Sequence, residues 1–186
     1  SVESTFKSES DKEKFDLAKK LKKKINKIRE DFTKDLEHTE LEKRQLATAL
    51  YLIDELAIRV GGKKDKKEQA DTVGVTSLRV EHLDLHDDNK VKLDFLGKDS
   101  IKFCKLFKVS DIVYKNLKEF IESKDKKTDL FDKINSSSLN NYLKEFMPDL
   151  SAKVWRTFKA SFTFQKELNK IKLDDVKDFE ESQKIN

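Results

Sequence analysis

Residues 91–107, VKLDFLGKDSIKFCKLF, decide the fold, because they interrupt a chain whose other apolar residues follow a helical spacing. Val91, Leu93 and Phe95 alternate with charged residues, which is the period-two pattern of a strand with one buried face. The short turn LGKDS then leads into a second apolar run, IKFCKLF. The pattern predicts a β-hairpin whose turn carries Lys98.

The residues before this hairpin also favour β-structure. Residues 75–85, VTSLRVEHLDL, are rich in β-branched and apolar side chains, and a short polar stretch separates them from the hairpin. We therefore expect a small antiparallel sheet, made of the hairpin and one further strand.

Helical periodicity precedes the sheet. The first apolar stripe comprises Phe15, Ala18, Leu21, Ile25, Ile28 and Phe32. It predicts a helix that begins near Ser10, with polar residues 1–10 outside it. The KKLKKK run on its other face fits a solvated helix surface, a DNA contact or a nuclear-import signal. A second helix is predicted over residues 41–60, ended by Gly61 and Gly62.

Helical periodicity also follows the sheet. Ser110 can cap a helix. A shorter helix is predicted over residues 137–146, before Pro148. Ser151 then opens a helix whose apolar stripe extends to Leu168.

The composition agrees with a mostly helical protein. Only 4 glycines and 1 proline occur in 186 residues, whereas tight turns and strand connections consume those residues. The fold class is therefore predicted as α+β, predominantly α-helical, with a small antiparallel sheet in the middle. We expect one unit, residues 1–186, with a helical part (1–62), a β part (75–107), a second helical part (110–170) and an unassigned tail (171–186).

Charge gives only a weak indication of the partner. The 40 basic and 36 acidic residues leave a formal charge of +4, which slightly favours a polyanion. Five of the basic residues are arginine, namely Arg29, Arg44, Arg59, Arg79 and Arg156. In a lysine-rich chain, arginine is enriched where a planar, bidentate donor is needed, although ordinary salt bridges are an equal alternative.

The single cysteine, Cys104, excludes an internal disulfide and fits a reducing compartment. No apolar stretch approaches the roughly 20 residues that a membrane span requires, so we expect none. The chain begins with Ser1 instead of Met, and we expect that it is a fragment of a longer protein.

Most catalytic motifs are missing from the sequence. It has no glycine-rich phosphate loop, no G-x-S-x-G elbow and no zinc-type cluster of Cys and His. We interpret His38, His82 and His86 as structural or surface residues, and we predict no metal site and no cofactor.

Three cationic residues offer a different chemistry. Arg59 and Arg156 lie off the apolar stripes of their predicted helices, and Lys98 lies in the hairpin turn. Two guanidinium groups and one ammonium can surround a phosphate and donate a proton to it. From spacing alone, all three side chains can equally be solvated.

Five blocks of the sequence resemble the core of the eukaryotic type IB DNA topoisomerases. They are KKLKKKINKIRED, KRQLATALYLIDELAIRVGGKK, ADTVGVTSLRVEHLDL, DFLGKDSIKF and LFDKINSSSLNNYLKEFMPDLSAKVWRTFKASFTFQKEL. The blocks follow the family's order from about residue 7 to residue 170, so the resemblance covers nearly the whole chain.

The resemblance implies a function and a mechanism. Members of this family relax supercoiled double-stranded DNA in the nucleus, without ATP or a metal. A tyrosine attacks a phosphodiester, which forms a 3′-phosphotyrosyl bond and frees a 5′-hydroxyl that later reverses the reaction. Two arginines, a lysine and a histidine assist the tyrosine. A monomer with an upstream clamp and a downstream tyrosine-bearing domain is implied.

The family's motifs place three catalytic residues in this chain. The first arginine matches Arg59 in AIRVGG, the lysine matches Lys98 in LGKDS, and the second arginine matches Arg156 in AKVWRT. Asp99 and Lys153 match positions near DNA.

The sequence also departs from the family. It has RTFKAS where the family usually has RTYNAS, so that Lys159 adds a charge that we expect near DNA. The assisting histidine and the nucleophilic tyrosine have no counterpart, and Tyr51, Tyr114 and Tyr142 are interpreted as structural. We therefore expect the isolated chain to be inactive.

Two alternatives share the same residues. A tyrosine site-specific recombinase uses the same phosphate chemistry, although the lysine-rich first helix and the ADTVG block fit it poorly. A DNA-binding module that kept the scaffold and lost the chemistry is the other alternative.

Overall fold

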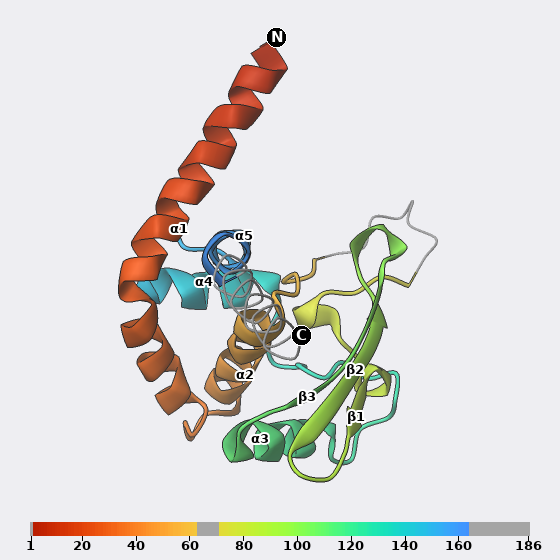
Figure 1. Ribbon diagram of the computed structural model, residues 1–186. Coiled ribbons are helices and arrows are strands. Elements are labelled where there is room, and N and C mark those ends of the chain that lie inside the picture. Colours follow the sequence, from red (N-terminus) through yellow and green to blue (C-terminus); the bar gives the residue numbers. More distant parts are fainter. Residues whose placement is uncertain (1, 63–70, 164–186) are drawn as a thin grey trace, which may run out of the picture.

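The fold was analysed in a computed structural model that describes residues 2–62 and 71–163, with side chains from residue 11 onward (Figure 1). The α-helices are α1 (Val2–Asp35), α2 (Leu41–Leu56), α3 (Asp111–Ile121), α4 (Ser136–Phe146) and α5 (Ala152–Phe158). The strands are β1 (Leu83–Leu85), β2 (Lys90–Leu96) and β3 (Lys102–Lys108). The predicted α+β class, mainly helical with a small antiparallel sheet in the middle of the chain, is confirmed.

Helix α1 carries the predicted apolar stripe into the core. Leu21, Ile28 and Phe32 are each at most 3% exposed, and α1 packs mainly against α5 and α2. The helix begins at Val2, so the prediction that residues 1–10 lie outside it is wrong. These residues contain no glycine or proline, and their Glu, Lys and Ser side chains tolerate a helix. Figure 1 shows the N-terminal part of α1 projecting from the rest of the molecule.

Helix α2 ends earlier than its pattern predicts. It stops at Leu56, where Ala57 adopts the left-handed conformation (φ 53°, ψ 33°) and donates its backbone N–H to Ile53 O at 2.8 Å. This is the αL type of helix C-cap, which usually requires glycine, so an alanine in that place gave no sequence signal. Arg59 therefore follows the helix in an extended segment, and its predicted helical position is wrong.

The sheet has the order β1-β2-β3, with both pairs antiparallel. The predicted hairpin is confirmed: Val91 pairs with Phe107 and Phe95 pairs with Phe103 across it. Val91, Leu93 and Phe95 are buried, as their alternation predicts. Figure 1 shows the sheet beside the helical body, with the β2–β3 turn and α3 at opposite ends of it.

The segment before β2 is only partly a strand. Residues 75–82 form two short 3-10 helices, Val75–Ser77 and Val80–His82, and only Leu83–Leu85 pair with β2. The predicted strand over 75–85 is thus wrong for most of its length. Val75 and Leu78 are both fully buried and lie three residues apart. A 3-10 turn places residues at this spacing on the same side, whereas a strand places them on opposite sides.

The later helices begin at the predicted polar caps. The Ser110 hydroxyl accepts from Val113 N at 3.4 Å, and the Ser151 hydroxyl accepts from Val154 N at 3.3 Å. Helix α4 begins one residue before the prediction and is capped by Asn135. Helix α5 ends at Phe158 and continues as a π-helix, Lys159–Thr163. The predicted continuation to Leu168 and the tail over 171–186 lie outside the described residues.

In the described part of the chain, every helix is too short or too polar to cross a bilayer.

Candidate active site

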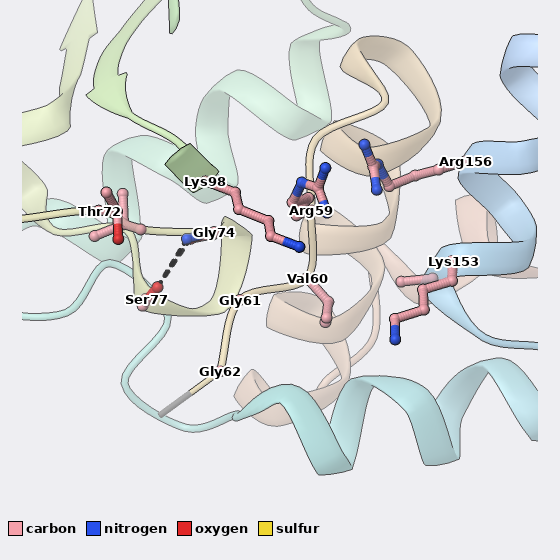
Figure 2. A pocket seen from close by; sticks show the side chains of 12 residues that line it. Arg59, Val60, Gly61, Gly62, Thr72, Gly74, Ser77, Lys98, Lys153 and Arg156 are labelled. Carbon is pink, nitrogen blue, oxygen red and sulfur yellow. Dashed lines mark hydrogen bonds between the residues drawn. The ribbon is translucent and has the colours of Figure 1, made fainter. Parts of the chain in front are cut away.

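One pocket of about 250 Å³ collects the cationic residues that the sequence singled out. Its lining includes Arg59, Lys98, Lys153 and Arg156. These side chains come from three separate places: the segment after α2, the β2–β3 turn, and helix α5. Figure 2 shows Lys98 extending toward Arg59 and Arg156 directed toward the same side, whereas the Lys153 ammonium is directed away from the two arginines.

The segment after α2 holds Arg59 by backbone pairing. Val75 N donates to Arg59 O at 2.8 Å, and Thr76 N and Oγ1 donate to Val60 O at 2.9 and 2.7 Å. The backbone of residues 59–60 is therefore fixed, while the Arg59 side chain is exposed to the pocket.

Two glycines make this pairing sterically feasible. A Cβ atom added to Gly74 would lie 2.3 Å from Gly61 N and 2.8 Å from Arg59 O. Gly61 itself has a φ of +85°, a left-handed conformation that glycine adopts without strain. Only glycine at position 74 allows the two segments to cross this closely, so Gly74 sets the position of the Arg59 backbone.

Residues 73–76 also hold the turn that carries Lys98. Val73 N donates to Leu96 O at 2.8 Å, and Gly97 N donates to Ile101 O at 2.7 Å. The turn is a 3-10 helix, Lys98–Ser100, so the predicted place of Lys98 between the two strands is confirmed. Residues 73–76 thus link the Arg59 backbone to the Lys98 turn.

Arg156 reaches the pocket from α5. Its Nε donates to Ala57 O, the carbonyl of the helix cap, at 2.9 Å. The side chain is half-buried and directed at the end of α2, so it does not simply point away from the protein as its helical wheel suggests. Burial, with a smaller contribution from the positive charge of Arg59, lowers the pKa of the Arg156 guanidinium.

The arginines fall into two groups, according to whether a described acidic side chain pairs with them. Arg29 binds Asp54, Arg44 binds Glu119, and Arg79 binds Asp71 and Glu81. Among residues 11–62 and 71–163, no acidic side chain lies within ion-pair distance of the pocket's four cations. Within the described part of the chain, the positive charge of the pocket is therefore not compensated, which favours an anion with several oxygens.

The residues predicted near DNA lie in different places. Lys153 lines the pocket, three residues before Arg156 on α5. Asp99 is exposed in the turn next to Lys98, with a φ of 63°, and does not line the pocket. The Lys159 side chain is only 17% exposed, its Nζ lies 4.0 Å from Asp54 Oδ1, and it does not line the pocket.

A second pocket, of about 260 Å³, adjoins the first and shares Arg59, Lys98 and Arg156 with it. Its remaining lining is largely apolar and comes from the end of α2 and from the hairpin. Three of the four cations therefore lie where the two hollows meet.

One cluster was not visible in the sequence. Ligand atoms of Asp71, Glu81 and His82 lie within 4.8 Å of one another, although we found no metal-type spacing around His82. The Arg79 guanidinium donates to Asp71 and Glu81, and its Nη2 lies 3.3 Å from His82 Nε2; its hydrogen bond lowers the pKa of Glu81. A cation thus already occupies the centre of this cluster, and we interpret it as an ion-pair network.

The three tyrosines lie outside the pocket, as expected for structural residues. Tyr142 on α4 donates its hydroxyl to Asp35 Oδ2 at 2.6 Å, and burial raises its pKa. Tyr114 on α3 donates to His86 O at 3.0 Å, and Tyr51 lies on α2. None of them lines either pocket around the cations.

The sequence matches the family model of the eukaryotic DNA topoisomerase I catalytic core over residues 3–186. It is 48% identical to DNA topoisomerase 1 of Caenorhabditis elegans over 187 residues, which cover 94% of this chain and 23% of the relative. Human DNA topoisomerase 1 is 45% identical over 177 residues, covering 92% of this chain and 23% of its own length. The mitochondrial DNA topoisomerase I of Rattus norvegicus is 48% identical over 167 residues, covering 87% and 28%.

The chain thus spans about a quarter of the length of these relatives. The family model, in contrast, matches nearly all of it, and the matched residues contain the pocket and every element that builds it. The chain belongs to the eukaryotic DNA topoisomerase I family and falls within that family's catalytic core.

Proposed function

We propose that this chain supplies the phosphate-binding part of the active site of a type IB topoisomerase. The complete enzyme would relax supercoiled double-stranded DNA by transient cleavage of one strand, through a 3′-phosphotyrosyl intermediate. The observation that carries the proposal is the convergence of Arg59, Lys98, Lys153 and Arg156 in one pocket without an acidic partner among the described side chains. Three other arginines of the same chain are ion-paired.

Arg59 and Arg156 suit the stabilisation of a phosphorane transition state. Negative charge increases on the nonbridging oxygens as the nucleophile attacks, and fixed guanidinium donors bind that charge more tightly than the ground state. The backbone pairing fixes the segment from which the Arg59 side chain extends, and the hydrogen bond to Ala57 O holds the Arg156 guanidinium before the substrate arrives. Such preorganisation reduces the reorganisation that the reaction requires.

Lys98 suits a general acid for the leaving 5′-oxygen. An alkoxide is a poor leaving group unless a proton is delivered to it, and an ammonium carries that proton at neutral pH. Lys98 lies on the turn opposite α5, so a phosphate bound by the two arginines would be within its reach (Figure 2). Lys153 and Asp99 would contact neighbouring parts of the DNA.

The nucleophile, the assisting histidine and the clamp are proposed to lie in other parts of the protein. The complete enzyme would act as a monomer in the nucleus, without ATP, a metal or another cofactor. A nuclear location is a proposal because one relative is named as mitochondrial. Fractionation of cells that express the tagged full-length protein tests it.

The overall proposal is tested by relaxation of a supercoiled plasmid. The full-length protein that carries this chain should relax the plasmid without ATP and in the presence of a chelator. The isolated chain should not relax it. Relaxation by the isolated chain would contradict the missing nucleophile, and an inactive full-length protein would contradict the function.

The acid role of Lys98 has its own test. Lys98→Ala should slow cleavage of ordinary DNA by about 100- to 10,000-fold, the range for one general acid. A substrate with a 5′-bridging phosphorothiolate has a leaving group that needs no proton, so it should restore most of the rate. Equal slowing on both substrates would assign Lys98 a different role.

A further inference from the structure

A buried carboxylate contacts the helices next to the pocket without lining it. Asp54 lies in the last turn of α2, and its side chain is 9% exposed. Its Oδ1 accepts from Trp155 Nε1 at 3.1 Å and from Arg29 Nη2 at 2.8 Å, while Oδ2 accepts from Arg29 Nε at 2.9 Å. One carboxylate thus joins three helices, α1, α2 and α5.

Trp155 connects this carboxylate to Arg156. The indole is fully buried, and neighbouring residues of an α-helix point about 100° apart, so Trp155 can face the core while Arg156 faces the pocket. Fixing the indole therefore fixes the rotation of α5 about its axis. That rotation decides where the Arg156 side chain leaves the helix.

Helix α2 binds α5 at a second point one turn further on. Ala57, three residues after Asp54, accepts the hydrogen bond from Arg156 Nε at 2.9 Å. Arg59 follows two residues later along the same backbone. The two contacts, Asp54–Trp155 and Ala57–Arg156, together set the position of one guanidinium relative to the other.

The negative charge of Asp54 is neutralised by cations that do not line the pocket. Arg29 binds the carboxylate bidentately, and Lys159 Nζ lies 4.0 Å from Oδ1. Asp54 therefore holds α5 without neutralising the pocket's arginines.

We propose that Asp54 is a positioning residue for the DNA cleavage reaction, acting through Trp155 to place Arg156 relative to Arg59. This inference rests on the proposed function, because it assigns Asp54 a role in the reaction attributed to the pocket.

The test compares two ring-to-carboxylate hydrogen bonds in the full-length protein. Trp155→Phe removes the donor to Asp54, and Asp54→Ala removes the acceptor. Tyr142→Phe is the matched control, because it removes the 2.6 Å bond from Tyr142 to Asp35 while α4 carries none of the four pocket cations. Single-turnover cleavage, DNA affinity and melting temperature are measured for each variant.

Trp155→Phe should slow cleavage by about tenfold with DNA affinity unchanged within about twofold, since a small misplacement of a reacting group is costly. Asp54→Ala should slow cleavage at least as much. Tyr142→Phe should lower the melting temperature but keep the cleavage rate. A wild-type rate for Trp155→Phe would overturn the proposal even if Asp54→Ala fails to fold.

A double-variant cycle separates positioning from general destabilisation. In an Arg156→Lys background, Trp155→Phe should slow cleavage by less than about twofold, because both changes affect the same interaction. Equal slowing in both backgrounds would overturn the inference. If Arg156→Ala left cleavage unchanged, the proposed function itself would fail. If Arg156→Ala slowed cleavage strongly while Trp155→Phe cleaved normally, only the role of Asp54 would be overturned.

Discussion

At the scale of single residues, the pairing of the arginines distinguishes structure from site. Arg44 and Glu119 tie α2 to α3, and Arg79 joins residues 71 and 81. Arg59 and Arg156 have no such partner in the described part of the chain, and burial together with the positive charge of Arg59 lowers the pKa of Arg156. An anion with several oxygens would stabilise two such like charges, which is the electrostatic reason to propose a phosphate as the ligand.

The glycine at position 74 gives a steric prediction. Gly74→Ala should lower the free energy of unfolding by about 2 kcal/mol, because the new methyl group would meet Gly61 backbone instead of a flexible side chain. Urea denaturation of the chain measures this. Gly62→Ala is the matched control, since among the described residues no atom beyond its chain neighbours lies within 4 Å of its added Cβ. Equal stability of the two variants would contradict the close crossing.

His82 gives a pH prediction. The His82 side chain is buried. Its Nδ1 accepts from Arg79 N at 2.9 Å, so this nitrogen carries no proton. Burial, followed by the charge of Arg79, lowers the pKa of His82 below its ordinary value of 6.5. A histidine that is neutral when folded takes up a proton on unfolding, so its contribution to stability is present above pH 6.5 and is lost as the pH falls below it.

Melting temperatures of the chain should therefore fall between pH 7 and pH 5, a window set by the ordinary histidine pKa of about 6.5. His82→Gln keeps an acceptor and cannot titrate, so the fall over this window should be smaller in that variant. An identical pH dependence in both proteins would show that His82 does not contribute.

At the scale of elements, the end of α2 determines how the cations are presented. The helix stops at a left-handed alanine, and its cap carbonyl accepts from Arg156. The sequence predicted a helix through residue 60, because Gly61 and Gly62 are the usual signal for a C-cap and Ala57 is an ordinary helix former. The earlier end is decided by tertiary contacts, namely the pairing of residues 59–60 with 75–76.

Ala57 provides a test of this helix end. Ala57→Gly should raise the free energy of unfolding by about 0.5–1 kcal/mol, because the left-handed conformation is strained for alanine and not for glycine. The backbone carbonyl that binds Arg156 is kept. A glycine at Leu56, which lies inside the helix, should destabilise instead, and chemical denaturation compares the two. Destabilisation by Ala57→Gly would place the end of α2 elsewhere.

Other elements were predictable to different degrees. The hairpin was readable from the strict alternation of Val91, Leu93 and Phe95, because a period of two has no helical counterpart. Residues 75–82 have strand-forming composition without alternation, and packing of Val75 and Leu78 into the core decided their conformation.

At the scale of the whole molecule, the sheet and the helical body together form the pocket. Lys98 comes from the β2–β3 turn of the sheet, and Arg156 comes from α5. Arg59 comes from the segment that connects α2 to the sheet. Neither part contains a complete phosphate site, and residues 73–76 link the two by hydrogen bonds to both. Spacing in the sequence identified the three residues as off-core cations, and the family motifs identified their roles as hypotheses. Their convergence and the contacts of Asp54 depend on tertiary structure and could not be read from spacing.

Salt gives a prediction for the molecule as a whole. DNA affinity of the full-length protein should fall steeply with ionic strength and depend little on sequence, because the pocket's groups are proposed to bind phosphates. Lys153→Ala should weaken binding and lower the salt slope by about one, the value for one phosphate contact. Fluorescence anisotropy over a range of salt concentrations measures both. An unchanged slope would place Lys153 away from the phosphates.

The central claim is that Arg59 and Arg156 stabilise the transition state of DNA cleavage. The most direct measurement is single-turnover cleavage by Arg156→Ala in the full-length protein, compared with its DNA dissociation constant. Cleavage should slow by about 100- to 1,000-fold, as for loss of one preorganised donor, while the dissociation constant should change by less than about fivefold. Weakened binding with an unchanged cleavage rate would contradict it.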